Sequence, residues 1–136
     1  MKPASFAVVA SIVCLSFASM AEARDRLGPN ETLARGESLT SNNGVHSLVC
    51  QDDGNLVLYI HGGSRARWAS NTWGRAITGC NMQGDGNLVL YAHNGSPVWA
   101  SGTHGHPGAY LIVQDDGNAV IYSTEGRALW STNTAF

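Results

Sequence analysis

The chain has 136 residues, a length typical of one domain, and a formal net charge of −2. It has only eight Lys and Arg residues and no basic patch, so we expect no nucleic-acid partner. Its 16 glycines and its many β-branched and aromatic residues favour an all-β fold, and since no stretch shows a 3.6-residue apolar period, we expect almost no helix.

Residues 1–23 have the pattern of a secretory signal peptide. Lys2 precedes an uncharged apolar run, and Ala21 and Ala23 are small residues at the two positions that a signal peptidase reads. The run from Ala4 to Met20 is short for a membrane span, and no stop-transfer segment follows. We expect residues 1–23 to be cleaved and residues 24–136 to be a secreted, extracellular domain without a membrane span; an N-terminal membrane anchor is the alternative.

Three internal repeats dominate the remaining sequence. QDDGNLVLY at Gln51–Tyr59 returns as QGDGNLVLY at Gln83–Tyr91 and as QDDGNAVIY at Gln114–Tyr122, with spacings of 32 and 31 residues. A second landmark keeps the same register, since each copy is followed eight or nine residues later by a Trp that opens WASNT, WASGT or WSTNT. Two landmarks in register over three copies indicate one structural unit made three times.

Each repeat is expected to form short strands joined by tight turns. In the third repeat we expect strands over Tyr110–Gln114, Asn118–Tyr122 and Ala128–Ser131. A sheet this small cannot bury its apolar face alone, but three sheets can pack together around a pseudo-threefold axis. The segment from Glu31 to Thr40 is expected to add a strand that completes one sheet.

The turn of the first motif is best explained by a three-residue loop, Asp52-Asp53-Gly54, with the glycine at positive φ. This loop pairs Gln51 with Asn55. One face then carries Gln51, Asn55, Val57 and Tyr59, with Asp53 beside them, and the other carries Cys50, Leu56 and Leu58.

The same parity places Cys50 and Cys80 toward the core. Cys14 leaves with the signal peptide, and the even number that remains in a secreted chain favours a Cys50–Cys80 disulfide bond. Two buried free thiols are the alternative.

Gln-x-Asp-x-Asn-x-Val-x-Tyr resembles the signature of the monocot mannose-binding lectins, also called bulb-type or snowdrop-type lectins. The resemblance covers the whole segment after the signal and includes the WASNT-type ends. It implies a β-prism II fold, with three antiparallel sheets around a pseudo-threefold axis and the repeat tryptophans inside. It also implies three mannose-binding pockets, which comprise Gln51, Asp53, Asn55, Val57 and Tyr59; Gln83, Asp85, Asn87, Val89 and Tyr91; and Gln114, Asp116, Asn118, Val120 and Tyr122.

The residue types suit a sugar independently of the resemblance. Hydroxyls donate and accept at once, carboxylates accept, carboxamides do both, and an aliphatic side chain suits the apolar side of the ring. In lectins of this type, the Asp and Asn bind the axial 2-hydroxyl, Gln the 3-hydroxyl and Tyr the 4-hydroxyl, while Val packs on the ring. We therefore expect a mannose-binding lectin whose partners are mannose-containing glycans or glycoproteins, with dimers or tetramers as a means of adding sites.

Other functions are less well supported by the sequence. Asp52 and Asp53 are adjacent in one turn, so they are poorly placed to flank one glycosidic bond. The position of Asp52 is occupied by Gly84 in the second copy, so the first Asp of the pair is dispensable. We therefore expect no enzyme. We expect no cofactor and no metal, because His104 and His106 lack a third ligand nearby. The alternative function is a lectin fold that acts by protein contact, as an inhibitor, toxin or taste-modifying protein, although all fifteen signature positions are intact here.

Overall fold

The computed structural model describes residues 24–61 and 63–136, so the predicted signal peptide lies outside it. The described residues form twelve short strands and contain no helix, which confirms the all-β prediction. In the described part of the chain there is accordingly no helix that is long and apolar enough to cross a membrane.

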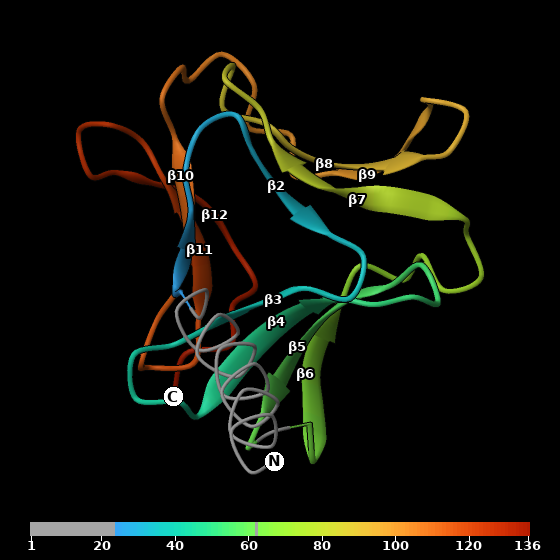
Figure 1. The fold of residues 1–136 in the computed structure, drawn as a ribbon. Coiled ribbons are helices and arrows are strands. Elements are labelled where there is room, and N and C mark those ends of the chain that lie inside the picture. Colours follow the sequence, from blue (N-terminus) through green and yellow to red (C-terminus); the bar gives the residue numbers. More distant parts are fainter. Residues whose placement is uncertain (1–23, 62) are drawn as a thin grey trace, which may run out of the picture.

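The strands form three four-stranded antiparallel sheets that face a common centre (Figure 1). The first sheet consists of β3 (Ser38–Thr40), β4 (His46–Cys50), β5 (Leu56–Ile60) and β6 (Arg65–Ala69). The second consists of β2 (Glu31–Ala34), β7 (Ile77–Met82), β8 (Leu88–Ala92) and β9 (Pro97–Ala100). The third consists of β1 (Arg26–Leu27), β10 (Tyr110–Val113), β11 (Ala119–Tyr122) and β12 (Ala128–Ser131). This is the predicted arrangement of one sheet per repeat, the β-prism II architecture.

The N-terminal segment differs from the prediction, because it supplies an edge strand to all three sheets rather than to one. Strands β1, β2 and β3 pair with β10, β7 and β4, respectively. Leu27, Leu33 and Leu39 point inward from these strands and are at most 1% exposed. Strands of two to four residues are too short to show a period-2 pattern, but the six-residue spacing of these leucines was a signal of three equivalent strands.

The predicted three-residue turn is present in every motif. In the first, the Gln51 N–H donates to the Asn55 carbonyl at 2.9 Å, and Gly54 has a φ of 96°. Gly54 is also required by space, because a Cβ there would lie 2.1 Å from the Arg75 carbonyl oxygen. The turn therefore fixes the register in which alternate residues of β5 face inward and outward.

Inward-facing side chains of the three sheets form a single apolar core, which includes Leu48, Leu56, Leu58, Leu90 and Ile121, all 0% exposed. Trp68, Trp99 and Trp130 close this core with a three-membered ring of edge-to-face contacts at centroid distances of 5.5–5.6 Å. Edge-to-face packing is a preferred aromatic geometry. The tryptophans of the second landmark therefore bind the three repeats to one another.

The two cysteines lie in this core, as the parity argument predicted. They are free thiols, so the structure corresponds to the alternative rather than to the favoured Cys50–Cys80 disulfide bond. Burial raises the pKa of the Cys50 thiol to about 11 and raises that of Cys80 further. In this environment both cysteines pack as small apolar side chains.

Candidate functional site

Each motif places its polar residues at one end of a hairpin, on the face opposite the core. We call these places sites 1, 2 and 3, after the motifs that begin at Gln51, Gln83 and Gln114. In all three the Asp lies on the turn and is exposed, while the Gln, Asn and Tyr are half-buried. All fifteen predicted residues are thus gathered into three sets of five.

The Asp side chain of each site turns back onto its own hairpin. One carboxylate oxygen of Asp53 accepts the Asn55 backbone N–H at 3.0 Å, and Asp85 and Asp116 make the same bond to Asn87 and Asn118. The second carboxylate oxygen takes no part in this bond. Each Asp therefore fixes the turn and still offers an acceptor to a ligand.

The Gln and Tyr of each site are hydrogen-bonded to each other through the carboxamide and the phenolic hydroxyl. In site 1, the Gln51 oxygen faces the Tyr59 hydroxyl, and its nitrogen lies 3.2 Å from both Asp53 carboxylate oxygens. The three side chains form a connected network without a ligand. Such a network holds its donors and acceptors in place before binding.

The Asn of each site is anchored by the residues that follow the repeat tryptophan. The Asn55 Oδ1 accepts from the Ser70 hydroxyl and from the Thr72 N–H, both at 3.2 Å, and the Thr72 hydroxyl donates to the Gly54 carbonyl at 2.6 Å. Equivalent bonds occur in the other repeats, from Ser101 and Thr103 to Asn87 and from Thr132 and Thr134 to Asn118. Because Oδ1 is occupied, the carboxamide nitrogen is the group that each Asn can present to a ligand.

These Ser and Thr residues support the site, and the sequence analysis did not identify them. Five of the six are buried, with exposed fractions of 5–7%: Ser70, Thr72, Thr103, Thr132 and Thr134. The signal was present in the second landmark, in which a hydroxyl residue recurs two and four positions after each Trp. Taken from the sequence alone, that landmark marks only the repeat.

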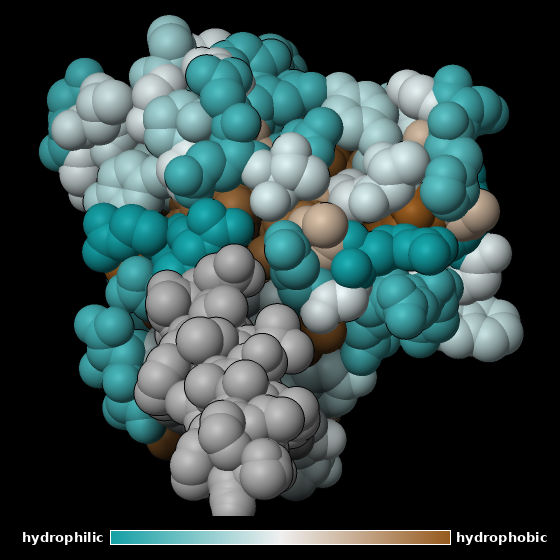
Figure 2. Space-filling model, in the orientation of Figure 1, coloured by the Kyte–Doolittle hydropathy of each residue, from teal (hydrophilic) through white to brown (hydrophobic). Residues whose placement is uncertain are grey.

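The motif valines form the floor of the sites. Val57, Val89 and Val120 lie on the outer face as predicted, yet each is only 3% exposed. The apolar surface available to a ligand is therefore a small patch in the centre of each set. On the face of the molecule that Figure 2 shows, the surface is mainly hydrophilic, and hydrophobic residues show mostly in the gaps between hydrophilic ones.

Two of the sites continue into hollows of the surface. The hollow at site 1 has a volume of about 440 Å³ and is lined by Ser38, Ser47, Val49, Gln51, Tyr59 and Gly63. The hollow at site 2 has a volume of about 370 Å³ and includes Gln83 and Asp85 of the motif. No group of three or more His, Cys, Asp or Glu residues that could hold a metal ion occurs among the described residues.

Several solved structures are similar to this chain in both fold and sequence. A monomeric monocot mannose-binding lectin from Gastrodia elata is 41% identical, with a TM-score of 0.72, over 82% of this chain and 99% of that one. The chain belongs to the bulb-type, or monocot mannose-binding, lectin family. The snowdrop (Galanthus nivalis) agglutinin, solved with methyl-α-D-mannoside, is 41% identical over 82% of this chain and 98% of that one, with a TM-score of 0.65.

The chain is also similar to lectins from a fungus and a fish. A lectin of the fungus Marasmius oreades is 35% identical, with a TM-score of 0.76, over 83% of this chain and 93% of that one. The B-type lectin plumieribetin of the fish Scorpaena plumieri is 48% identical over 48 residues, which are 35% of this chain and 40% of that protein. No family model matches the sequence. These relatives are lectins, which are non-enzymatic sugar-binding proteins, in agreement with the expectation that this chain is not an enzyme.

Proposed function

We propose that this chain is a secreted lectin that binds terminal mannose through sites 1, 2 and 3. The observation that carries the proposal is the repetition of one polar network on three outer faces, with the same partners for the Asp, Asn, Gln and Tyr each time. Folding requires the turn glycine and the inward leucines, but it does not require Gln and Tyr at fixed positions on the solvent side.

Each polar group has a role in hydroxyl recognition. The second carboxylate oxygen of the Asp accepts from the axial 2-hydroxyl, and the free nitrogen of the Asn donates to the same hydroxyl. The Gln and Tyr reach the 3- and 4-hydroxyls, and the Val patch meets the C–H surface of the ring. Because the network is formed before binding, a sugar with an equatorial 2-hydroxyl leaves these groups unpaired and binds less well.

A single site of this kind binds weakly. A hexose has about twelve heavy atoms, and at roughly 0.3–0.4 kcal/mol each the binding free energy is about 4–5 kcal/mol, which is near millimolar. Useful affinity then comes from several sites that engage one branched glycan or one cell surface. Three sites on one chain supply this multivalency, and dimers or tetramers extend it, in keeping with a role in defence or recognition.

The direct test is retention of residues 24–136 on immobilised mannose. We expect elution by free mannose and not by galactose. The variant that combines Asp53→Asn, Asp85→Asn and Asp116→Asn loses retention, because each site loses a charged acceptor while the side-chain oxygen that fixes the turn is kept. The matched control is Asp52→Asn, since Asp52 is adjacent to Asp53 but its side chain is 83% exposed and, among the described residues, forms an ion pair only with Arg35, at 3.8 Å. Failure of the parent protein to be retained, or its elution by galactose, would overturn the proposal and favour the protein-contact function.

Secretion has its own test. Expression of the full chain in a secreting eukaryotic host should release a protein whose N-terminal residue is Arg24. Recovery of the chain only in the membrane fraction with residues 1–23 retained would support an N-terminal anchor instead.

A further inference from the structure

The three motifs match, but the strands beside them do not. The residues paired directly with the motif valines are Val49, Asn81 and Ile112. The residues one strand further out are Ser38, Thr32 and Arg26. Directly paired residues point to the same side of a sheet, so these rows extend sites 1, 2 and 3 sideways.

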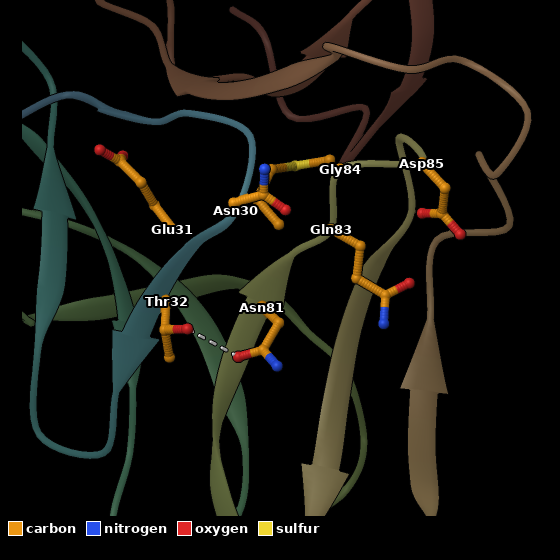
Figure 3. A pocket seen from close by; sticks show the side chains of 8 residues that line it. Asn30, Glu31, Thr32, Asn81, Gln83, Gly84 and Asp85 are labelled. Atoms are coloured by element: carbon orange, nitrogen blue, oxygen red, sulfur yellow. Dashed lines mark hydrogen bonds between the residues drawn. The ribbon is translucent and has the colours of Figure 1, made fainter.

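Site 2 alone has a pair of hydrogen-bonding side chains in both positions of this row. The Thr32 hydroxyl donates to the Asn81 Oδ1 at 3.0 Å, which fixes the orientation of the carboxamide (Figure 3). Within the described part of the chain, no protein group accepts from the Asn81 nitrogen. Asn81 therefore holds an oriented donor beside the motif, where site 1 has Val49 and site 3 has Ile112.

The rim of site 2 also differs, at Gly84, where the other motifs have Asp52 and Asp115. A Cβ at Gly84 would lie 2.8 Å from Oδ1 and 3.3 Å from Nδ2 of Asn30, so the glycine makes room for that carboxamide. The Asn30 backbone N–H holds its turn in place by donating to the Met82 carbonyl at 2.7 Å. The rim of site 2 thus presents a neutral carboxamide instead of a carboxylate.

Asn30 and Asn81 are parts of one hollow. The site 2 hollow is lined by Asn30, Glu31, Thr32 and Asn81 together with Gln83 and Asp85 of the motif. Figure 3 shows Asn30 beside Gly84, and Asn81 on the strand that leads into Gln83. One oxygen of the Glu31 carboxylate, Oε1, is already engaged, because it accepts the Gly28 N–H at 2.7 Å and pairs with Arg24 at 3.4 Å.

We propose that this hollow is a subsite for a second hexose, so that site 2 recognises a disaccharide unit while sites 1 and 3 recognise mostly the terminal residue. The inference rests on the proposed mannose function of the motif. A carboxamide offers both a donor and an acceptor, which is the pattern that neighbouring sugar hydroxyls require. Asn30 and Asn81 supply two carboxamides in a hollow that is continuous with Gln83 and Asp85.

The test isolates site 2 in a variant with Asp53→Asn and Asp116→Asn, produced in bacteria so that the Asn30-Glu31-Thr32 sequon carries no glycan. Titration calorimetry compares methyl α-mannoside with the α1,2-, α1,3- and α1,6-linked methyl dimannosides. We expect at least one dimannoside to bind about fivefold or more tightly than methyl α-mannoside. Adding Asn81→Ala should remove this preference and leave the affinity for methyl α-mannoside within about twofold, since that affinity comes from the motif.

Asn30 is tested by Asn30→Gly, because its φ of 67° is tolerated by Asn and Gly but would strain most other residues. We expect a partial loss of the same preference. The matched control is Val49→Ala in a protein that keeps only site 1, through Asp85→Asn and Asp116→Asn. It should change the ratio of dimannoside to monosaccharide affinity less than twofold, since Val49 has no hydrogen bond to lose. Thermal unfolding of each variant checks that the fold is intact.

The outcomes separate the two proposals. If the site 2 protein does not bind methyl α-mannoside, then the mannose function fails at this site and the subsite fails with it. If it binds methyl α-mannoside but prefers none of the dimannosides, or if Asn81→Ala leaves the preference unchanged, then only the subsite is wrong.

Discussion

On strand β5, the inward residues and the outward residues meet entirely different surroundings. Leu56 and Leu58 are 0% exposed and contact the shared core. Tyr59 is half-buried and is hydrogen-bonded to Gln51. Alternation along one strand therefore separates the side chains that hold the three sheets together from those that lie on the outer face.

The separation is incomplete at one residue of each motif. Asn55 faces outward, yet its Oδ1 accepts hydrogen bonds from the Ser70 hydroxyl and the Thr72 N–H, and Ser70 and Thr72 are both buried. The Asn and its hydroxyl partners thus connect the outer face to the interior, while the leucines lie on the inner face alone and the Tyr on the outer face alone.

The largest expected effect comes from the inward face. Leu58→Ala should lower the free energy of unfolding by about 2–5 kcal/mol, because it leaves a cavity in a core that all three repeats share. Denaturant unfolding followed by tryptophan fluorescence measures this loss. Binding per folded molecule should be unchanged, since Leu58 does not contact the outer face. A loss of affinity in fully folded Leu58→Ala protein would show that the faces are coupled.

The inward face also carries both thiols, which make its stability depend on pH. Burial raises the pKa of Cys50 from 9.0 to about 11 and raises that of Cys80 in the same direction. The folded state therefore holds these protons more tightly than the unfolded state. The stabilisation is complete below pH 9 and is lost as the pH rises toward 11, at roughly 1.4 kcal/mol per pH unit for one thiol.

Unfolding curves between pH 8 and pH 11 measure this slope. The variant with Cys50→Ala and Cys80→Ala is the control, and its stability should fall less steeply over the same range. Identical slopes would mean that the thiols do not ionise on unfolding in this range. Reaction with a thiol reagent should likewise be slow in the native protein and fast in denaturant.

The sequence was sufficient for the turn register and the three-sheet arrangement, because alternation and repetition are local signals. It was insufficient for the disulfide bond, since parity gives the direction of Cys50 and Cys80 but not whether they are bonded. It was also insufficient for the three N-terminal edge strands, because the pairing of a strand of two to four residues is decided by distant partners. Leu27, Leu33 and Leu39 do show the required spacing.

The site, like the fold, could be predicted from the sequence only where its residues lie close together along the chain. The fifteen motif residues could be grouped because each set lies within nine consecutive positions. The support from Ser70 and Thr72 spans up to 18 residues, and the row of Thr32 and Asn81 spans 49, so both depend on how the hairpins pair. Local sequence therefore predicts the shared part of the three sites, and long-range pairing determines their differences.

A smaller effect is expected where the two faces meet. Thr72→Val removes a hydroxyl that is bonded to the Gly54 carbonyl at 2.6 Å and to the Ser70 hydroxyl at 2.7 Å, in a residue that is 6% exposed. Because these partners are left unpaired, we expect a loss of about 1–3 kcal/mol in unfolding free energy. Affinity at site 1 should fall slightly as well, since the Ser70 hydroxyl, which donates to the Asn55 Oδ1, loses its bond to the Thr72 hydroxyl. The control is Asn71→Gly at the exposed neighbouring position. Glycine keeps the positive φ of Asn71, so the free energy of unfolding should change by less than about 0.5 kcal/mol.

The smallest effect on stability belongs to the outward face. In a protein that keeps only site 1, Tyr59→Phe removes one hydroxyl, and the free energy of unfolding should change by less than about 0.5 kcal/mol, because solvent can replace the lost bond to Gln51. Affinity for methyl α-mannoside should nevertheless fall by about tenfold, which corresponds to one net hydrogen bond of about 1.4 kcal/mol. Calorimetric titration and thermal unfolding of the same sample measure both quantities. A large loss of stability with no loss of affinity would reverse the assignment, because it would place Tyr59 among the residues that hold the sheet rather than among those that face the sugar.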